Sequence, residues 1–126
     1  MQDFFGPVIH CYTRAEAITD GTLIDLSRNY PDQCSIYRHP VACTAAVWCL
    51  IEQGAGNNNG TSHSGIVWDI LYMSQHGVVA RPNDQTVLFE VIVSVRGCSG
   101  RHRLKAMCHP GDHQEPVITI MLPGED

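Results

Sequence analysis

The chain has 126 residues, of which 44% are hydrophobic and 17% are charged, and its formal net charge is −5. This length suits one hydrophobic core, so we expect residues 1–126 to form a single domain. The acidic balance argues against a duplex-DNA binder with a large phosphate footprint, although it leaves room for a local basic stripe. The apolar runs are all too short to span a membrane.

The first residues, "MQDFFGPV", do not combine a basic stretch with an apolar run. We therefore expect no signal peptide and a cytoplasmic location. In that compartment the six cysteines are expected to be reduced thiols. No two of them form a C-x-x-C pair, which argues against a structural zinc site, and we expect no cofactor.

The first predicted elements are a strand over residues 8–11 and a short helix after it. Thr13 and Glu16 have the spacing of a capping box, in which each side chain binds the other residue's backbone N–H. Gly21 suits the left-handed residue that ends such a helix. Residues 22–27 then predict a buried strand, and residues 28–40, which contain two prolines, predict a long loop.

A central buried helix is predicted for "PVACTAAVWCLIEQG", from Pro40 to Gly54. Pro suits the first position of a helix, and Gly suits its end. The residues between them are small or apolar on nearly every side, which is typical of a buried helix. Cys43 and Cys49 are expected to lie in the core as small apolar side chains.

A loop over residues 54–65 and a second helix ending at Gly77 follow. The helix should bury Ile66, Ile70 and Met73 on one face and expose Asp69 on the other.

The C-terminal third changes to a period of two residues, which is typical of strands. Segments 86–95, 101–108 and 116–122 are joined by short turns and predict an antiparallel meander. In the first strand, Leu88, Glu90 and Ile92 lie on the face opposite the alternating valines. Leu88 and Ile92 would be exposed there, so we expect a second copy to cover them in a homodimer.

The segment "CHPGDH" is the densest cluster of reactive residue types. Cys108 should point into the core from its strand. Pro110, Gly111 and Asp112 are turn residues: Gly tolerates a positive φ, and Asp binds its own backbone. His109 and His113 flank this turn and, with Asp112, are weak candidates for a metal site, because a hairpin tip gives such ligands little support.

Two groups of residues are candidates for a binding surface. Arg14 can bind a phosphate or carboxylate with its forked guanidinium, and a cleft for a ligand would draw on Tyr12, Arg14, Tyr37, Trp68 and Asp69. The simpler interpretation places these side chains at the core edge or in solvent. Arg101, Arg103 and Lys105 share one strand face and form either a solvated surface paired with Glu90 or a patch for an acidic partner. RNA is disfavoured because that face lacks aromatic residues.

Four segments of the chain resemble a family of small uncharacterised bacterial proteins carried on plasmids and other mobile elements. They are "FGPVIHCYTRAEAITDGTLIDLS", "PVACTAAVW", "GIVWDILYM" and "KAMCHPGDHQEPVITIMLPGED". The resemblance implies a bacterial accessory protein and no assigned activity. Cys108, Pro110, Gly111 and Asp112 match the family pattern, whereas the two flanking histidines depart from it, which weakens the metal hypothesis.

A fainter resemblance to ADP-ribosyltransferase folds lies in "IHCYTRAEAITDGTLID", with Glu90 in the place of the late catalytic Glu. The predicted fold is α+β, with two main helices and one short helix packed on an antiparallel sheet that ends in a three-stranded meander. The predicted function is a non-enzymatic interaction protein of bacterial mobile DNA with a protein partner. The alternative is a small ligand-binding domain or enzyme with a pocket beside loops 28–40 and 54–65.

Overall fold

The computed structural model describes residues 12–56, 62–81, 83–95 and 98–125. The strand predicted for residues 8–11 lies outside them, as does the middle of the predicted loop 54–65. The α+β class is confirmed. The sheet is mixed, however, so the prediction of an antiparallel sheet is wrong at one strand pair.

The sheet has five strands in the order β1-β2-β5-β4-β3. The meander predicted from the C-terminal third is confirmed, because β3 pairs antiparallel with β4 and β4 pairs antiparallel with β5. The parallel pair joins β2 to β5. The strands are β1 (Leu23–Asp25), β2 (Val41–Thr44), β3 (Thr86–Val95), β4 (Cys98–Pro110) and β5 (Pro116–Met121).

In the described ranges, five helices accompany the sheet: α1 (Arg14–Asp20), α2 (Leu26–Asn29), α3 (Pro31–Cys34), α4 (Ala45–Ala55) and α5 (His63–Ala80). The long loop predicted for residues 28–40 is therefore wrong in its first half. Local capping explains the difference. The Asp25 side chain accepts a hydrogen bond from Arg28 N at the start of α2, and Pro31 occupies the first turn of α3, where its missing N–H costs nothing.

The capping box of α1 is confirmed. The Thr13 hydroxyl accepts from Glu16 N, the Glu16 carboxylate accepts from Thr13 N at 3.0 Å, and Gly21 ends the helix with a φ of 88°. A residue with a side chain would be strained in that left-handed conformation. The sequence therefore fixes both ends of this short helix locally.

The predicted start of the central helix at Pro40 is wrong, because Val41–Thr44 form β2 and α4 begins only at Ala45. Thr44 caps α4, since its hydroxyl accepts from Val47 N, and this cap stops the helix from extending backwards. Cys43 is buried in β2 as predicted, whereas Cys49 is exposed on α4. Burial raises the pKa of the Cys43 thiol to about 12.

Helix α5 runs past Gly77, its predicted end, to Ala80. At Gly77 the helix packs closely on β3, where an added Cβ would lie 2.6 Å from Cγ1 of Val87. Ile66 and Ile70 are buried as predicted, but Met73 is 40% exposed. The glycine therefore serves a close approach between helix and sheet and not a helix end.

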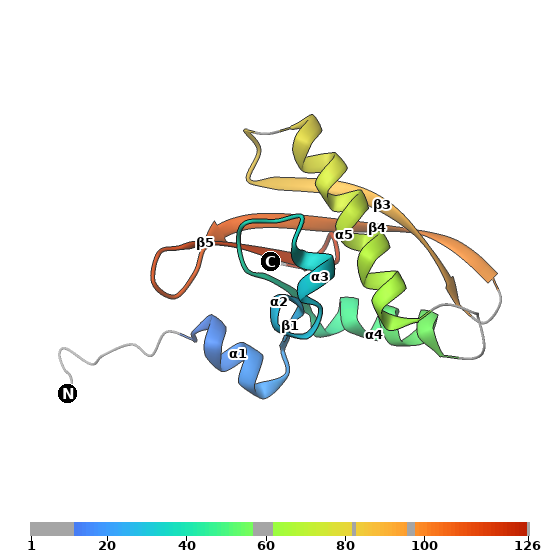
Figure 1. The fold of residues 1–126 in the computed structure, drawn as a ribbon, viewed down its shortest axis with the longest axis horizontal. Coiled ribbons are helices and arrows are strands. Elements are labelled where there is room, and N and C mark those ends of the chain that lie inside the picture. Colours follow the sequence, from blue (N-terminus) through green and yellow to red (C-terminus); the bar gives the residue numbers. More distant parts are fainter. Residues whose placement is uncertain (1–11, 57–61, 82, 96–97, 126) are drawn as a thin grey trace.

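Helices α4 and α5 cover one face of the sheet, and α5 packs on β3 (Figure 1). We call this the front face and the opposite one the back face. The alternating valines of β3 face the front, and the core continues through Leu104, Ala106, Ile118 and Ile120. Helix α1 lies next to β1, which is the edge strand opposite β3 (Figure 1).

None of the helices in the described ranges combines the length and the apolar character that a bilayer span requires.

Candidate functional site

Asp112 connects the "CHPGDH" turn to the far end of the chain. Its carboxylate oxygens accept hydrogen bonds from Arg14 N at 2.7 Å and from Ala15 N at 3.0 Å. These two amides belong to the first turn of α1, and their hydrogen bonds lower the pKa of Asp112. We expected Asp112 to bind its own backbone, and that prediction is wrong. The turn instead holds a helix that lies about a hundred residues earlier in the chain.

The left-handed residue of this turn is Gln114, with a φ of 67°, and not Gly111. Gln114 is the only non-glycine residue of the described ranges with a positive φ. Gly111 N donates to Glu115 O at 2.6 Å, and Gln114 N donates to Gly111 O at 3.1 Å, so two hydrogen bonds hold the turn closed. A side chain in this conformation carries a cost of about 1 kcal/mol.

Arg14 crosses from α1 to β5 on the back face. Its Nη1 donates to the Thr119 hydroxyl at 2.7 Å, and its Nη2 donates to the carbonyl of Ile118 at 3.0 Å. Burial lowers the pKa of the Arg14 guanidinium, and the carboxylates of Asp25, Asp112 and Glu115 oppose this effect. Both acceptors are neutral, so Arg14 joins the helix to the sheet without a direct ion pair among the described residues.

His109 continues this hydrogen-bond chain. Its Nε2 lies 2.8 Å from the Thr119 hydroxyl, and its Nδ1 lies 3.2 Å from the carbonyl of Pro110. A carbonyl can only accept, so Nδ1 carries the hydrogen, and in the neutral ring Nε2 then accepts from Thr119. The hydrogen bonds therefore run in one direction, from Arg14 through Thr119 and His109 to Pro110.

These contacts separate the three weak metal candidates. His109 binds Thr119, Asp112 binds the first amides of α1, and His113 is exposed at the turn. Within the ranges that the structure describes, no group of three or more His, Cys, Asp or Glu side chains is placed to hold a metal ion.

A cavity of about 620 Å³ lies beside this chain, between α1 and the back face. We call it the back cavity. Tyr12 and Arg14 line it together with Thr119, His109 and Glu125. The Tyr12 hydroxyl donates to Asp20, which raises the pKa of Tyr12.

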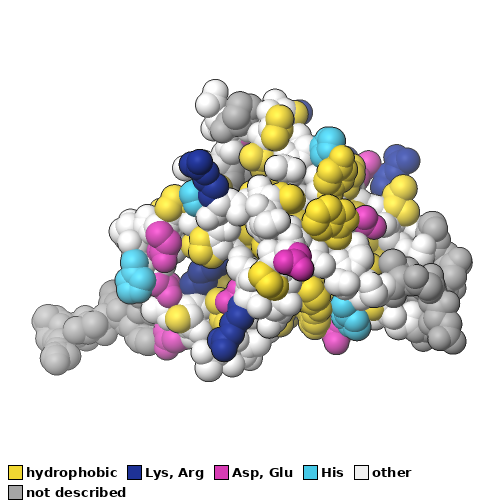
Figure 2. All heavy atoms as spheres, in the orientation of Figure 1, with side chains coloured by type: hydrophobic (Ala, Val, Ile, Leu, Met, Phe, Trp, Pro, Cys, Tyr) yellow, Lys and Arg dark blue, Asp and Glu magenta, His cyan; other side chains and the backbone are white. Residues whose placement is uncertain are grey.

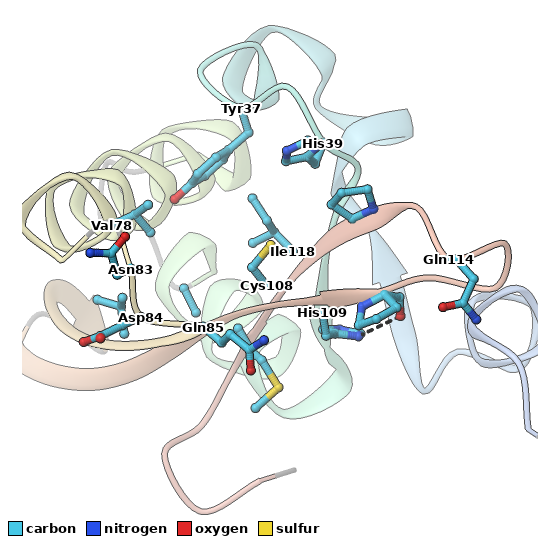
Figure 3. A pocket seen from close by; sticks show the side chains of 15 residues that line it. Tyr37, His39, Val78, Asn83, Asp84, Gln85, Cys108, His109, Gln114 and Ile118 are labelled. Carbon is cyan, nitrogen blue, oxygen red and sulfur yellow. Dashed lines mark hydrogen bonds between the residues drawn. The ribbon is translucent and has the colours of Figure 1, made fainter.

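A second cavity, of about 490 Å³, lies on the front face where β4 extends beyond α5 (Figure 3). We call it the front cavity. Its apolar floor includes Val87, Ala106 and Ile118, and Tyr37 forms one wall with its hydroxyl 2.8 Å from that of Ser74. Polar side chains surround this floor: His39, Asn83, Asp84, Gln85 and Gln114.

Cys108 is exposed at the front cavity, so the prediction of a buried core thiol is wrong. The side chain of Cys108 does lie on the predicted, core-facing side of the sheet, because Cys108 follows the buried Leu104 and Ala106 at two-residue spacing. The helices do not reach this far along β4, which leaves the last residue of the row uncovered (Figure 3).

The opposite edge of the sheet carries exposed apolar side chains on both of its faces. Leu88 and Ile92 of β3, on the back face, are 53% and 63% exposed, in agreement with the sequence pattern. On the front, hydrophobic side chains gather over α5 (Figure 2). We call this surface the edge strip, and it consists of Trp68, Tyr72, Met73, Leu88 and Ile92.

The basic face, Arg101, Arg103 and Lys105, lies beside the edge strip and is partly paired with Glu90. Arg101 and Arg103 each lie 3.8 Å from a different carboxylate oxygen of Glu90, as the simpler interpretation expected. Lys105 donates to the carbonyl of Glu125. Such exposed pairs are weak, and the single carboxylate of Glu90 offsets only one of the three positive charges of Arg101, Arg103 and Lys105.

The structure divides the predicted ligand residues among three surfaces. Tyr12 and Arg14 line the back cavity, Tyr37 lines the front cavity, and Asp69 lines a groove at the edge of β3. Trp68 is exposed on α5. Glu90 lines the same groove as Asp69, whereas Tyr12 and Arg14 line the back cavity.

Sequence reasoning missed Thr119 and Gln114. Thr119 occupies an apolar strand, and its alternation with Ile118 and Ile120 was the available signal of a polar residue on the back face. Nothing in the sequence marked Gln114.

The whole chain, residues 1–126, matches the model of a family of unknown function, DUF6573. The protein therefore belongs to that family. Neither the curated proteins nor the solved structures contain a significant match.

Proposed function

We propose that this protein is a non-enzymatic, cytoplasmic interaction protein of bacterial mobile DNA and that it binds a second copy of itself through the edge strip. The setting in mobile DNA rests on the sequence resemblance alone. The interaction itself rests on one observation: large apolar side chains are exposed on both faces of the sheet along β3. Contiguous patches of this kind commonly mark protein interfaces.

The distribution of the candidate residues also favours an interaction over catalysis. A cleft formed jointly by Tyr12, Arg14, Tyr37 and Trp68 would have supported a small enzyme or ligand-binding domain. These residues lie instead on separate surfaces, and large apolar side chains are exposed along β3.

Sedimentation equilibrium tests this proposal. We expect the wild-type protein to be a dimer at micromolar concentration and Ile92→Asp to weaken the association by about a hundredfold. Two copies of Ile92 each lose roughly 1.5 kcal/mol of burial in this variant. Ile92→Thr keeps the β-branched shape and should show a smaller effect in the same direction.

Gln53→Asp adds the same charge to the exposed side of α4 and serves as the control, which should leave the dimer intact. A wild-type protein that stays monomeric at tens of micromolar would contradict the proposal. Equal association of Ile92→Asp and Gln53→Asp would place the interface elsewhere.

A second candidate function is the binding of a small, uncharged ligand in the front cavity. The specific observation is an apolar floor surrounded by polar side chains, including His39, Asn83 and Gln85, for which no side-chain hydrogen bond is found among the described residues. Volumes of several hundred Å³ with this composition are typical of ligand sites. The lining contains no Lys or Arg, so a phosphorylated ligand would lack a counter-charge.

Native mass spectrometry of the untagged protein tests the ligand hypothesis, because it reads bound mass and subunit number together. A bound small molecule that is lost on Gln85→Ala would support it. A thermal-shift screen of uncharged heterocycles that finds no ligand would count against it.

A further inference from the structure

Among the described residues, no strand pairs with the outer edge of β3. β3 is the last strand in the sheet order and pairs with β4 on one side only. Cys108 N donates to Gln85 O at 2.8 Å, so Gln85 directs its backbone groups towards β4. In an antiparallel ladder this direction alternates along the strand. Thr86, Leu88, Glu90 and Ile92 therefore direct their N–H and C=O groups away from β4, towards the open side.

A groove of about 440 Å³ runs along this edge. Asp69, Tyr72 and Met73 of α5 form one wall, and the other wall includes Ile92 and Arg101. Helix α5 thus flanks the edge without covering it, which leaves the room that an added strand needs. The strand contains neither Pro nor Lys, two residues by which proteins commonly block such edges.

We propose that β3 pairs antiparallel with β3 of a second copy across a two-fold axis, so that two sheets join into one. This inference rests on the proposed function and specifies its geometry. A two-fold axis perpendicular to the sheet places like surfaces together on both faces. It brings α5 beside α5 of the partner on the front, and it brings the row of Leu88 and Ile92 beside the same row on the back.

This symmetry is the reason to choose a second copy over a peptide. An added peptide strand would satisfy the open backbone groups of β3. It would still leave Trp68 and Tyr72, which are exposed on α5, without the partner helix that would cover them. A second copy covers the front and the back in one step.

Charge then selects the register. If Glu90 faced Glu90 of the second copy, two like charges would lie directly opposite each other, which destabilises a strand pair. Shifting the pairing by two residues places Glu90 opposite Ile92 of the second copy, and the reverse pair forms by symmetry. Residues 87–95 of each strand still face one another in this register. Each Glu90 also keeps its own contacts with Arg101 and Arg103.

The hydrogen-bonding pattern permits this register. Glu90 and Ile92 both direct their backbone groups to the open side, so they can form a hydrogen-bonded pair. Val91 then faces Val91 of the second copy in a non-hydrogen-bonded pair, where side chains approach most closely. Both valines point to the front, beneath the helices, where the core of each copy already lies.

Register-specific cysteine pairs test the proposal. Glu90→Cys and Ile92→Cys proteins, one carrying a mass tag, are mixed, allowed to exchange subunits and oxidised. Directly opposite residues have Cα atoms about 5.5 Å apart, which is within disulfide range. We expect a mixed disulfide-linked dimer, and we expect its loss when Thr86→Cys replaces either variant. Thr86 of one copy would lie roughly 30 Å from Thr86 of the other.

Each outcome has a distinct meaning. The parent protein, oxidised alone, measures cross-linking through the exposed Cys49 and Cys108. Cross-linking of Glu90→Cys with itself, at the expense of the mixed pair, would overturn the register. A sedimenting dimer with none of these cross-links would overturn pairing through β3 but preserve the proposed function. A monomer in sedimentation would overturn both.

Discussion

The two edges of the sheet, at β1 and at β3, differ in how the rest of the chain covers them. At the β1–β5 side, α1 joins the back face through hydrogen bonds from Arg14 and to Asp112. At the β3 side, the back face carries Leu88 and Ile92 in solvent, and the strand edge has no partner within the described chain. The chain thus covers its own sheet with a polar, directional contact at one end and leaves large apolar side chains exposed at the other.

The largest intramolecular effect is expected at the contact between α5 and β3. Gly77→Ala introduces a Cβ that would lie 2.6 Å from Cγ1 of Val87, whose side chain is buried. Overpacking of this kind costs about 1–3 kcal/mol and exceeds the gain in helix propensity. Urea denaturation should show a lower free energy of unfolding. In the double variant Gly77→Ala/Val87→Ala, the loss in the free energy of unfolding should be smaller than the sum of the two single losses. If the two losses simply add, the close contact between these residues is absent.

Arg14→Met should have the next largest effect, because it leaves the Ile118 carbonyl and the Thr119 hydroxyl without their donor. We expect a loss of about 1–2 kcal/mol in the free energy of unfolding. Arg14→Lys should recover little, since one ammonium cannot replace two guanidinium donors at separate acceptors. The exposed Arg81→Met is the control. Equal effects of the two methionine variants would show that the bridge contributes nothing specific.

Asp112→Asn should destabilise the protein less than Arg14→Met does. It should also change how the free energy of unfolding depends on pH. The native carboxyl has a pKa below its ordinary value of 3.8. Its stabilising contribution is therefore complete above pH 3.8 and declines as the pH falls through the lower, folded-state pKa. In the variant, the free energy of unfolding should therefore fall less steeply with acid than in the wild type. Denaturation curves from pH 5 to about pH 2 measure this difference, with His113→Asn as the matched control.

The smallest effect is expected at Gln114. Gln114→Gly relieves the left-handed backbone but adds freedom to the unfolded chain, so we expect a stabilisation of less than about 1 kcal/mol. Gln114→Val should destabilise, because a β-branched residue tolerates a positive φ poorly. If both variants had the same stability, the strain at this turn would be absent.

Local patterns predicted the parts of the fold that local chemistry determines. The Thr13–Glu16 spacing identified both the helix and its cap, and the two-residue alternation of the C-terminal third identified the meander and the exposure of Leu88 and Ile92. The parallel pairing of β2 was not predictable in this way. "VACT" is as apolar as the helix that follows it, and only its position between β1 and β5 makes it a strand.

The candidate sites were predicted less well for a related reason. Asp112 binds α1, nearly a hundred residues away in sequence, and no local rule connects the two. Cys108 was placed on the correct face, but the sequence does not say how far the helices extend over that face. The chain of hydrogen bonds that joins Arg14, Thr119 and His109 on the back face likewise depends on which strands become neighbours.

Amide hydrogen exchange along β3, followed by NMR, tests directly whether β3 pairs with a second copy. In an unpaired edge strand the amides of Leu88, Glu90 and Ile92 face solvent, while those of Phe89 and Val91 are bonded to β4. If β3 pairs with a second copy, all five amides should be protected at high concentration. The even-numbered amides should lose protection on dilution or in Ile92→Asp. Fast exchange of the even-numbered amides at every concentration, beside slow exchange of the odd-numbered ones, would rule out pairing through β3.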